Sequence, residues 1–161
     1  MKKILMLVAC FVFASSLYAQ ISDAEADAVA NLLGVQKREA IAKLVHISGK
    51  DSIAFWRLYG EYQKANVATA KSRIGLYEKT ALAYGDMTPA IADSLAKRYF
   101  ENRISQEKSL EEYYKKIKAA TNAITAFEFY QAEVYILTQV RAHIMQQIPT
   151  YSEFKMATGK R

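Results

Sequence analysis

The chain has 161 residues, of which 52% are hydrophobic and 24% are charged, and it carries a formal net charge of +6. Its length suits a single ordinary domain. Cys10 is the only cysteine, which excludes an intrachain disulfide framework and a metal site built from several thiolates.

The first nineteen residues have the pattern of a secretory signal peptide. Lys2 and Lys3 precede an apolar run from Ile4 to Ala14, and the small residue Ala19 precedes Gln20. The lysines hold the start on the cytoplasmic side, the apolar run enters the translocon, and a small residue suits the signal peptidase. We therefore expect cleavage after Ala19 and a protein that is periplasmic or secreted.

Two other interpretations of this segment stay open. A retained membrane anchor requires about 20 continuous apolar residues, which is more than the run provides. The alternative of a lipoprotein signal rests on Leu7-Val8-Ala9-Cys10, in which the small residue Ala9 precedes a cysteine, as in a lipobox. The apolar stretch ahead of Cys10 is shorter than the usual roughly 7 to 15 residues. We therefore favour the soluble product.

Cleavage would also change the charge. Without Lys2 and Lys3 the basic residues fall from 22 to 20 against 16 acidic ones, a net charge of +4. This excess favours acidic partners or anionic membrane surfaces. The basic residues form no clustered stripe, so nucleic acid is not expected as a partner.

The sequence after Gln20 predicts an all-α protein, because glycines are few and alternating strand patterns are absent. Ser22-Asp23-Ala24-Glu25 has the form of a capping box and predicts a short helix to about Leu33. A second short helix is expected over residues 36–47. Its apolar face would comprise Ile41, Leu44 and Val45.

Two long helices are expected next. After a turn at Ser48–Asp51, large apolar and aromatic residues recur at helical spacing as far as Tyr84. Thr88 is a candidate N-cap with Pro89 at the first helical position, and the second long helix would run to about Ala119. The pair predicts a helical hairpin or curved bundle. The stripe of the first helix comprises Phe55, Trp56, Tyr59, Tyr62, Val67, Ile74, Tyr77, Leu82 and Tyr84, and that of the second comprises Ile91, Leu95, Tyr99, Ile104, Leu110, Tyr114 and Ile117.

A last helix is expected to begin at Thr125-Ala126-Phe127-Glu128 and to stop at Pro149. The domain would thus span residues 20–150. Residues 151–161 show no helical periodicity and predict a flexible C-terminal tail. The expected apolar face of the last helix is Phe127, Tyr130, Val134, Leu137, Ile144 and Ile148.

Three segments resemble landmarks of a group of uncharacterised exported helical proteins. They are residues 55–62 (Phe-Trp-Arg-Leu-Tyr-Gly-Glu-Tyr), residues 129–133 (Phe-Tyr-Gln-Ala-Glu) and residues 147–149 (Gln-Ile-Pro). That group is distantly similar to the periplasmic Spy and CpxP proteins, whose helical hairpins curve into a cradle. The Leu-Thr-x-x-Gln repeats of those proteins are not present here as such. The resemblance implies a chaperone or stress-adaptor role.

No residue constellation identifies a reaction. His46 and His143 are remote from each other, and neither has a second histidine or cysteine three or four residues away, so a zinc site is not expected. Glu128 and Glu133 would lie about 140° apart around a helix and would not pair as acid and base. Glu133 is expected to bond a basic or tyrosyl group on the long hairpin, with Arg73 or Arg103 as candidates. We expect no enzymatic activity and no cofactor.

Aromatic residues carry the functional hypothesis. Ten of the 11 tyrosines follow Ala19, and a tyrosine ring suits both a shallow core and an adaptable binding surface. Most rings would join the helices, while a subset among basic residues would form a surface for unfolded chains. The candidate polypeptide-binding residues are Arg98, Arg103, Tyr113, Lys115, Lys116 and Lys118.

The sequence therefore predicts an exported, non-catalytic polypeptide-binding protein of the Spy and CpxP kind. Its expected partners are unfolded or envelope proteins, with peripheral membrane contact and a homodimer left open. The alternative is a structural or sensory envelope protein that docks one specific membrane partner.

Overall fold

A computed structural model describes residues 37–159, and every regular element in this range is helical. The predicted all-α class is therefore confirmed. The signal peptide, its cleavage site and the first short helix lie outside the described residues. Residues 37–44 are helical and are followed by α3 (Ser52–Ala83), the short 3₁₀ turn η1 (Tyr84–Asp86), α4 (Pro89–Ala120), α5 (Ala123–Gln146) and α6 (Tyr151–Thr158).

Side-chain caps set where the later helices begin. The Thr88 hydroxyl accepts a hydrogen bond from the Ile91 amide, and Pro89 occupies the first turn of α4 as the sequence predicts. Helix α5 begins at Ala123, two residues before the predicted start, because the side-chain oxygen Oδ1 of Asn122 accepts from the Ile124 and Thr125 amides. Such a cap satisfies amides that the first turn leaves without partners.

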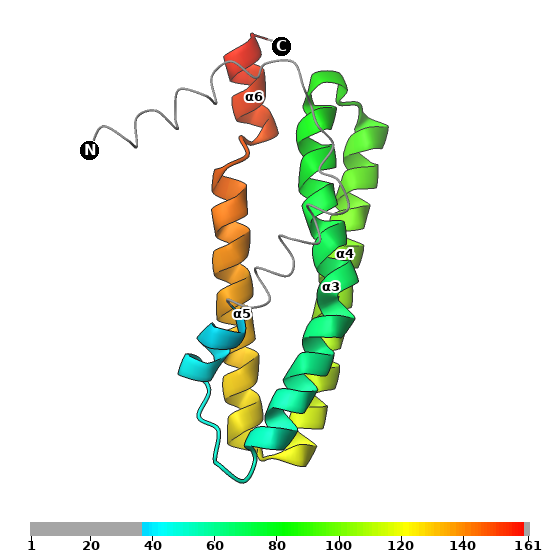
Figure 1. Cartoon of the computed structure of the whole chain (residues 1–161). Coiled ribbons are helices and arrows are strands. Elements are labelled where there is room, and N and C mark those ends of the chain that lie inside the picture. Colours follow the sequence, from blue (N-terminus) through cyan, green and yellow to red (C-terminus); the bar gives the residue numbers. More distant parts are fainter. Residues whose placement is uncertain (1–36, 160–161) are drawn as a thin grey trace, which may run out of the picture.

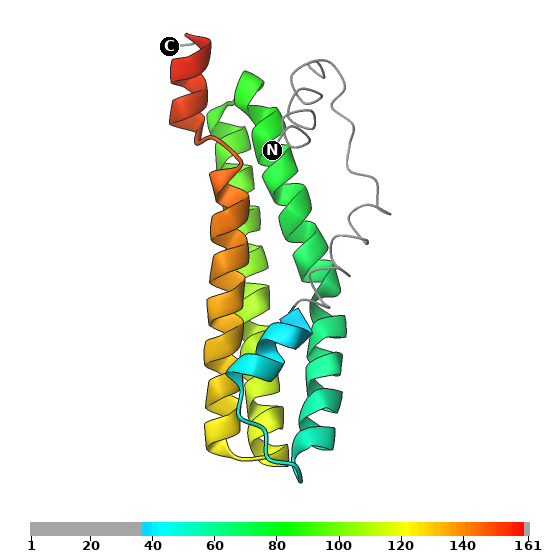
Figure 2. The ribbon, with the colours of Figure 1, turned by 60° about the vertical axis from the view of Figure 1, so that its left-hand side comes forward.

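Helices α3, α4 and α5 run lengthwise beside one another (Figures 1 and 2). Helix α4 packs along both α3 and α5, whereas α3 and α5 meet mainly through long side chains. The rings of Tyr62 on α3 and Phe129 on α5 are 5.3 Å apart and perpendicular, the edge-to-face arrangement that aromatic pairs favour.

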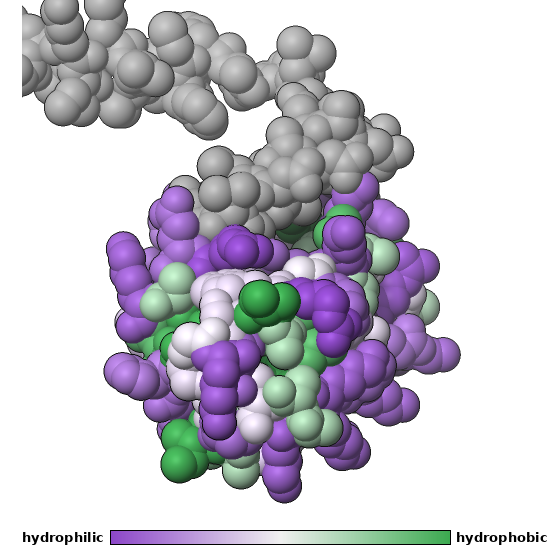
Figure 3. Space-filling view, turned by 60° about the horizontal axis from the view of Figure 1, so that its bottom comes forward, coloured by the Kyte–Doolittle hydropathy of each residue, from purple (hydrophilic) through white to green (hydrophobic). Residues whose placement is uncertain are grey.

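The hydrophobic core occupies one half of this assembly, at the end where α3 begins and α4 turns into α5. The helical residues 37–44 cover it (Figure 1). Seen from this end, the surface is largely hydrophilic and hydrophobic residues form only small groups (Figure 3). The core residues are Ile41, Val45, Phe55, Leu58, Tyr59, Tyr62, Leu110, Tyr113, Ile117, Ala126, Phe129, Ala132 and Ile136.

The predicted apolar faces need correction. Leu44 is 48% exposed although Ile41 and Val45 beside it are buried. On α5 the predicted face is wrong because the buried positions include small residues and Glu133, which a search for large apolar residues passes over. The buried residues of α5 are Thr125, Ala126, Phe129, Ala132, Glu133 and Ile136, whereas Phe127, Tyr130 and Val134 are exposed.

The far ends of the predicted stripes are also more exposed than expected. Val67 and Leu82 on α3 and Ile91 and Ile104 on α4 are exposed. In α3 beyond Tyr62, Leu76 is the one buried residue. The long helices therefore extend well past the core that joins them.

The C-terminal segment contains a helix where the sequence predicts no regular structure. Helix α6 opens with a capping box between Thr150 and Glu153 and ends at Gly159, whose φ of 64° is left-handed. The rings of Tyr151 and Phe154 each lie 5.5 Å from that of Tyr84. Helix α6 is therefore anchored at the end where α3 connects to α4 (Figure 1).

Candidate functional site

A fully buried carboxylate lies in the core. Glu133 on α5 accepts hydrogen bonds from Lys37 Nζ at 2.8 Å and from the hydroxyls of Tyr59 and Tyr62 at 3.1 and 2.9 Å. A buried charge requires such partners, because burial removes it from the water that would otherwise solvate it. Burial, and then the Glu133 charge, raise the pKa values of Tyr59 and Tyr62 far above their ordinary value.

The hydrogen bonds continue along the α3–α4 interface. Gln106 Nε2 donates to the Tyr62 hydroxyl at 3.2 Å, and Gln106 Oε1 accepts from Arg73 at 3.1 Å. Arg73 also donates to Asn102 Oδ1 at 3.0 Å. A tyrosyl partner for Glu133 was expected and is confirmed, but Arg73 and Arg103 are not its partners. Its basic partner is Lys37, which precedes the long helices.

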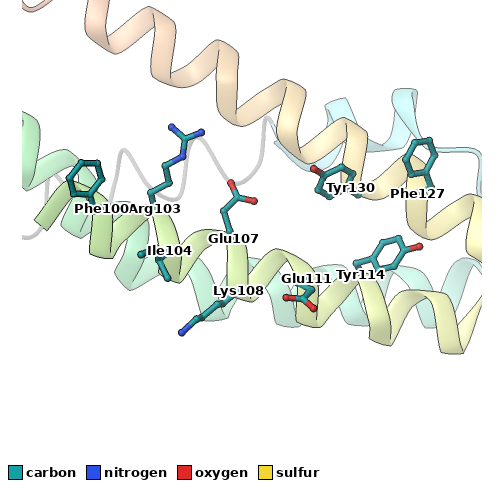
Figure 4. A pocket seen from close by; sticks show the side chains of 9 residues that line it. All are labelled: Phe100, Arg103, Ile104, Glu107, Lys108, Glu111, Tyr114, Phe127 and Tyr130. Carbon is teal, nitrogen blue, oxygen red and sulfur yellow. The ribbon is translucent and has the colours of Figure 1, made fainter. Parts of the chain in front are cut away.

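An apolar groove lies between α4 and α5. It measures about 770 Å³, and we call it the α4–α5 groove. Phe100 is 66% exposed, Ile104 54% and Phe127 50%. The side chains of Arg103 and Glu107 rise from α4 toward α5, while Lys108 points away (Figure 4). The groove is lined by Phe100, Arg103, Ile104, Glu107, Lys108, Glu111, Tyr114, Phe127 and Tyr130.

Helical spacing explains how α4 forms both the core and this groove. The buried residues of α4 recur every three or four positions and are Asn102, Gln106, Leu110, Tyr113 and Ile117. The groove residues recur at the same interval but are offset by one or two positions, which turns them to a different side of the helix. Helix α4 thus has one face buried in the core and another that lines the groove.

A second cavity, of about 400 Å³, lies among α3, α4, α5 and the segment leading into α6. We call it the arginine cavity. It shares Phe100 and Arg103 with the α4–α5 groove. Burial, and then the nearby charge of Arg141, lower the pKa of Arg73. The cavity is lined by Arg73, Tyr77, Thr80, Tyr84, Tyr99, Phe100, Asn102, Arg103, Arg141, Met145, Ile148, Pro149 and Thr150.

The structure does not gather the predicted polypeptide-binding residues into one patch. Arg103 lines the α4–α5 groove, whereas Arg98 lines a separate depression between α3 and α4. Lys115 and Lys116 are exposed and pair with the glutamates four residues before them, and Lys118 lies exposed on the last turn of α4.

Tyr113 needs a correction. Its side chain is only 7% exposed, and its ring packs 5.4 Å from that of Tyr62. Tyr113 therefore belongs to the core, and Lys116 Nζ lies 4.4 Å from the ring centroid on its outer side. A buried ring at this position is unavailable as a contact surface for a client.

Sequence reasoning missed four principal groove residues as site residues. Ile104, Phe127 and Tyr130 were assigned to apolar faces of the predicted helices, and Phe100 belongs to none of the predicted faces. Their one sequence signal is an aromatic or aliphatic residue every three or four positions. A core face produces the same signal, so the spacing alone does not separate the two.

The histidines and carboxylates form no evident metal site in the described part of the chain. There, no group of three histidine, cysteine, aspartate or glutamate side chains is placed to hold an ion. Glu128 instead accepts a hydrogen bond from the backbone amide of His46 at 2.7 Å, which ties the loop before α3 to α5. None of the helices between residues 37 and 159 has the length and hydropathy needed to cross a bilayer.

Comparison with known proteins finds no family model, no curated protein and no solved structure that matches this chain.

Proposed function

We propose that the protein is exported after cleavage behind Ala19 and binds polypeptides without catalysis, as a chaperone or stress adaptor of the Spy and CpxP kind. The observation that carries this proposal is the α4–α5 groove. It exposes large apolar side chains on two helices that are held in place by a core on their other faces.

The chemistry of the groove suits unfolded chains. Exposed contiguous apolar surface on a soluble protein usually marks an interaction site. Phe100, Ile104 and Phe127 provide apolar contacts of no fixed sequence preference. Because these three side chains are at least half exposed, a client segment reaches them from the surface, which keeps binding weak and exchangeable.

Charge adds to this binding in two ways. Arg103 and Glu107 rise toward α5 and place both signs in the groove, so segments of mixed charge find local partners. The net positive charge of the chain raises the encounter rate with acidic clients. In this proposal Lys115, Lys116 and Lys118 act through that general attraction, since they lie outside the groove lining.

The test is suppression of aggregation. The purified mature protein should keep a reduced or heat-unfolded model client in solution at near-stoichiometric ratio without ATP. Suppression should weaken as salt rises toward about 0.5 M, where the Debye length shrinks to a few ångströms. The double variant Ile104→Ser with Phe127→Ser should lose most of the effect, because it removes apolar contact area from both walls of the groove.

The matched control is Ile53→Ser. Ile53 is 85% exposed and lies on α3, outside the groove lining, so this variant should suppress aggregation like the unchanged protein. Equal loss in both variants, or no suppression at about tenfold excess over several unrelated clients, would refute the groove as a client site. The second outcome would favour the alternative of an envelope protein that docks one specific membrane partner.

A further inference from the structure

The arginine cavity combines apolar walls with converging positive charge. Its walls include the rings of Tyr77, Tyr99 and Phe100 and the aliphatic side chains of Met145 and Ile148. Three arginines, Arg73, Arg103 and Arg141, line the same space, and no aspartate or glutamate is among the lining residues. An apolar pocket with a few convergent polar groups is the usual form of a small-molecule site.

The charge of these arginines lacks a carboxylate partner within the described range. Arg73 donates only to the amide oxygens of Asn102 and Gln106, and the ion pairs found there include none of the three arginines. Arg141 and Arg103 both act on Arg73 as like charges. Like charges held close together beside apolar walls repel each other, and an anion placed among them would relieve that repulsion.

The rigid forks of the guanidinium groups suit an anion that offers two oxygens side by side. A guanidinium presents several N–H donors in a rigid fork that matches a carboxylate with two parallel hydrogen bonds. The apolar walls favour a carboxylate that carries an apolar chain, because a free inorganic anion would leave these walls in contact with water. The volume of about 400 Å³ lies at the small-ligand end of the usual range for pockets.

We propose that the arginine cavity binds a single-chain fatty carboxylate. Its carboxylate lies among Arg73, Arg103 and Arg141, and its alkyl chain lies against Tyr77, Met145 and Ile148. This site is distinct from the α4–α5 groove in ligand and in most of its residues. The two meet only at Phe100 and Arg103.

The experiment is isothermal titration of the full mature chain with dodecanoate below its micelle concentration. Acetate provides the head without the chain, and dodecyltrimethylammonium provides the chain with the opposite charge. We expect one dodecanoate per chain, and much weaker binding of both other probes. Equal affinity for dodecanoate and dodecyltrimethylammonium, or no dodecanoate binding up to about 1 mM, would overturn the proposal.

Variants locate the site. Arg141→Gln should weaken dodecanoate binding roughly tenfold, the usual effect of losing a hydrogen bond to a charged group, while Arg141→Lys should retain part of it. Arg57→Gln is the control, because Arg57 is exposed on α3, pairs with Glu61 and does not line the cavity. Unchanged affinity in Arg141→Gln would overturn the proposed position.

The variant Arg141→Gln also distinguishes fatty carboxylate binding from the proposed binding of polypeptides. Arg141 does not line the α4–α5 groove, so Arg141→Gln should suppress aggregation normally while it binds dodecanoate weakly. Melting of each variant without ligand checks that it is folded. Fatty carboxylate binding that fails while aggregation suppression persists would overturn only the inference drawn from the arginine cavity.

Discussion

Helices α3, α4 and α5 build two halves of different character. In one half, aromatic rings from α3 and α5 fill the space between the helices, and the helical residues 37–44 cover them. We call this the filled half. In the other half, the same helices enclose the arginine cavity, and no ring pair joins α3 to α5 among the aromatic contacts of the described residues. This is the hollow half.

A chain of hydrogen bonds runs from one half to the other. Glu133 in the filled half bonds Tyr62, Tyr62 bonds Gln106, and Gln106 bonds Arg73 in the hollow half. At one end the buried charge meets the opposite charge of Lys37. At the other end Arg73 donates to the amide oxygens of Asn102 and Gln106, and it pairs with no carboxylate among residues 37–159. The comparison indicates that the filled half supplies stability through its core, while the hollow half contains the cavity in which we propose that a fatty carboxylate binds.

The largest effect is expected when the filled half loses its carboxylate. Glu133→Ala leaves Lys37 and the hydroxyls of Tyr59 and Tyr62 without their acceptor, and breaking a buried pair in this way costs about 3 to 5 kcal/mol. Glu133→Gln should recover part of the loss, because its amide oxygen accepts from one tyrosine. Urea unfolding measures both. A near-neutral Glu133→Ala, comparable with the exposed control Glu111→Gln, would contradict a filled half that depends on this carboxylate.

A matched pair of phenylalanines tests the comparison itself. Phe129 is fully buried, whereas Phe100 is 66% exposed. Phe129→Ala should lower the free energy of unfolding by about 3 to 5 kcal/mol, and Phe100→Ala should change it by at most about 0.5 kcal/mol. Denaturant midpoints measure the difference. Equal losses in the two variants would show that the halves contribute alike to stability.

Alkaline pH should lower the stability of the protein through two tyrosines of the filled half. Burial, and then the Glu133 charge, raise the pKa values of Tyr59 and Tyr62 above the ordinary value of 10.0. The folded protein therefore keeps two protons that the unfolded chain releases. Their contribution to stability is complete below pH 10 and falls as the pH rises beyond it. Stability that stays level across this range would contradict the raised pKa values, and with them the burial of the two hydroxyls beside the Glu133 charge.

A single substitution tests this dependence of stability on alkaline pH. Tyr62→Phe removes one of the two protons, so its stability should depend less steeply on alkaline pH than that of the unchanged protein, whatever its stability at neutral pH. Tyr135→Phe is the control, because Tyr135 is 58% exposed. Denaturant titrations at several alkaline pH values measure the slopes.

The smallest effect is expected at the edge of the hollow half. Thr150→Ala removes the hydroxyl that caps α6, and the loss of such a cap costs about 1 kcal/mol. Because α6 packs on Tyr84 and not on the core, the loss should stay local. Hydrogen exchange should speed up for α6 amides alone. Faster exchange in α5 as well would show that α6 supports the bundle.

Local signals in the sequence located several helix boundaries. Thr88 and Pro89 mark the start of α4 because a cap and a fixed φ are properties of neighbouring residues. The Thr150–Glu153 capping box at the start of α6 is equally local, but it was not recognised in the sequence, where the missing helical periodicity of residues 151–161 predicts a flexible tail. The class of partner for Glu133 was also predicted, because a buried carboxylate needs donors.

The α4–α5 groove could not be predicted from the sequence, for a physical reason. A helix in contact with two others has more than one apolar face, and spacing alone does not say which face meets a partner. Phe127 and Phe129 are two positions apart on α5, yet one is 50% exposed and the other is fully buried. Ala126 and Ala132 are buried on the same side of α5 as Phe129, and neither belongs to the large apolar residues from which a helical face is predicted.

The most direct test of client binding in the α4–α5 groove is a methyl spectrum of the isoleucines with and without an unfolded client peptide. Ile104 lines the groove, Ile53 is exposed outside it and Ile117 is buried in the core. The proposed site predicts that the Ile104 methyl resonance shifts on titration while those of Ile53 and Ile117 stay in place. An unmoved Ile104, or an equal shift of Ile53, would contradict it.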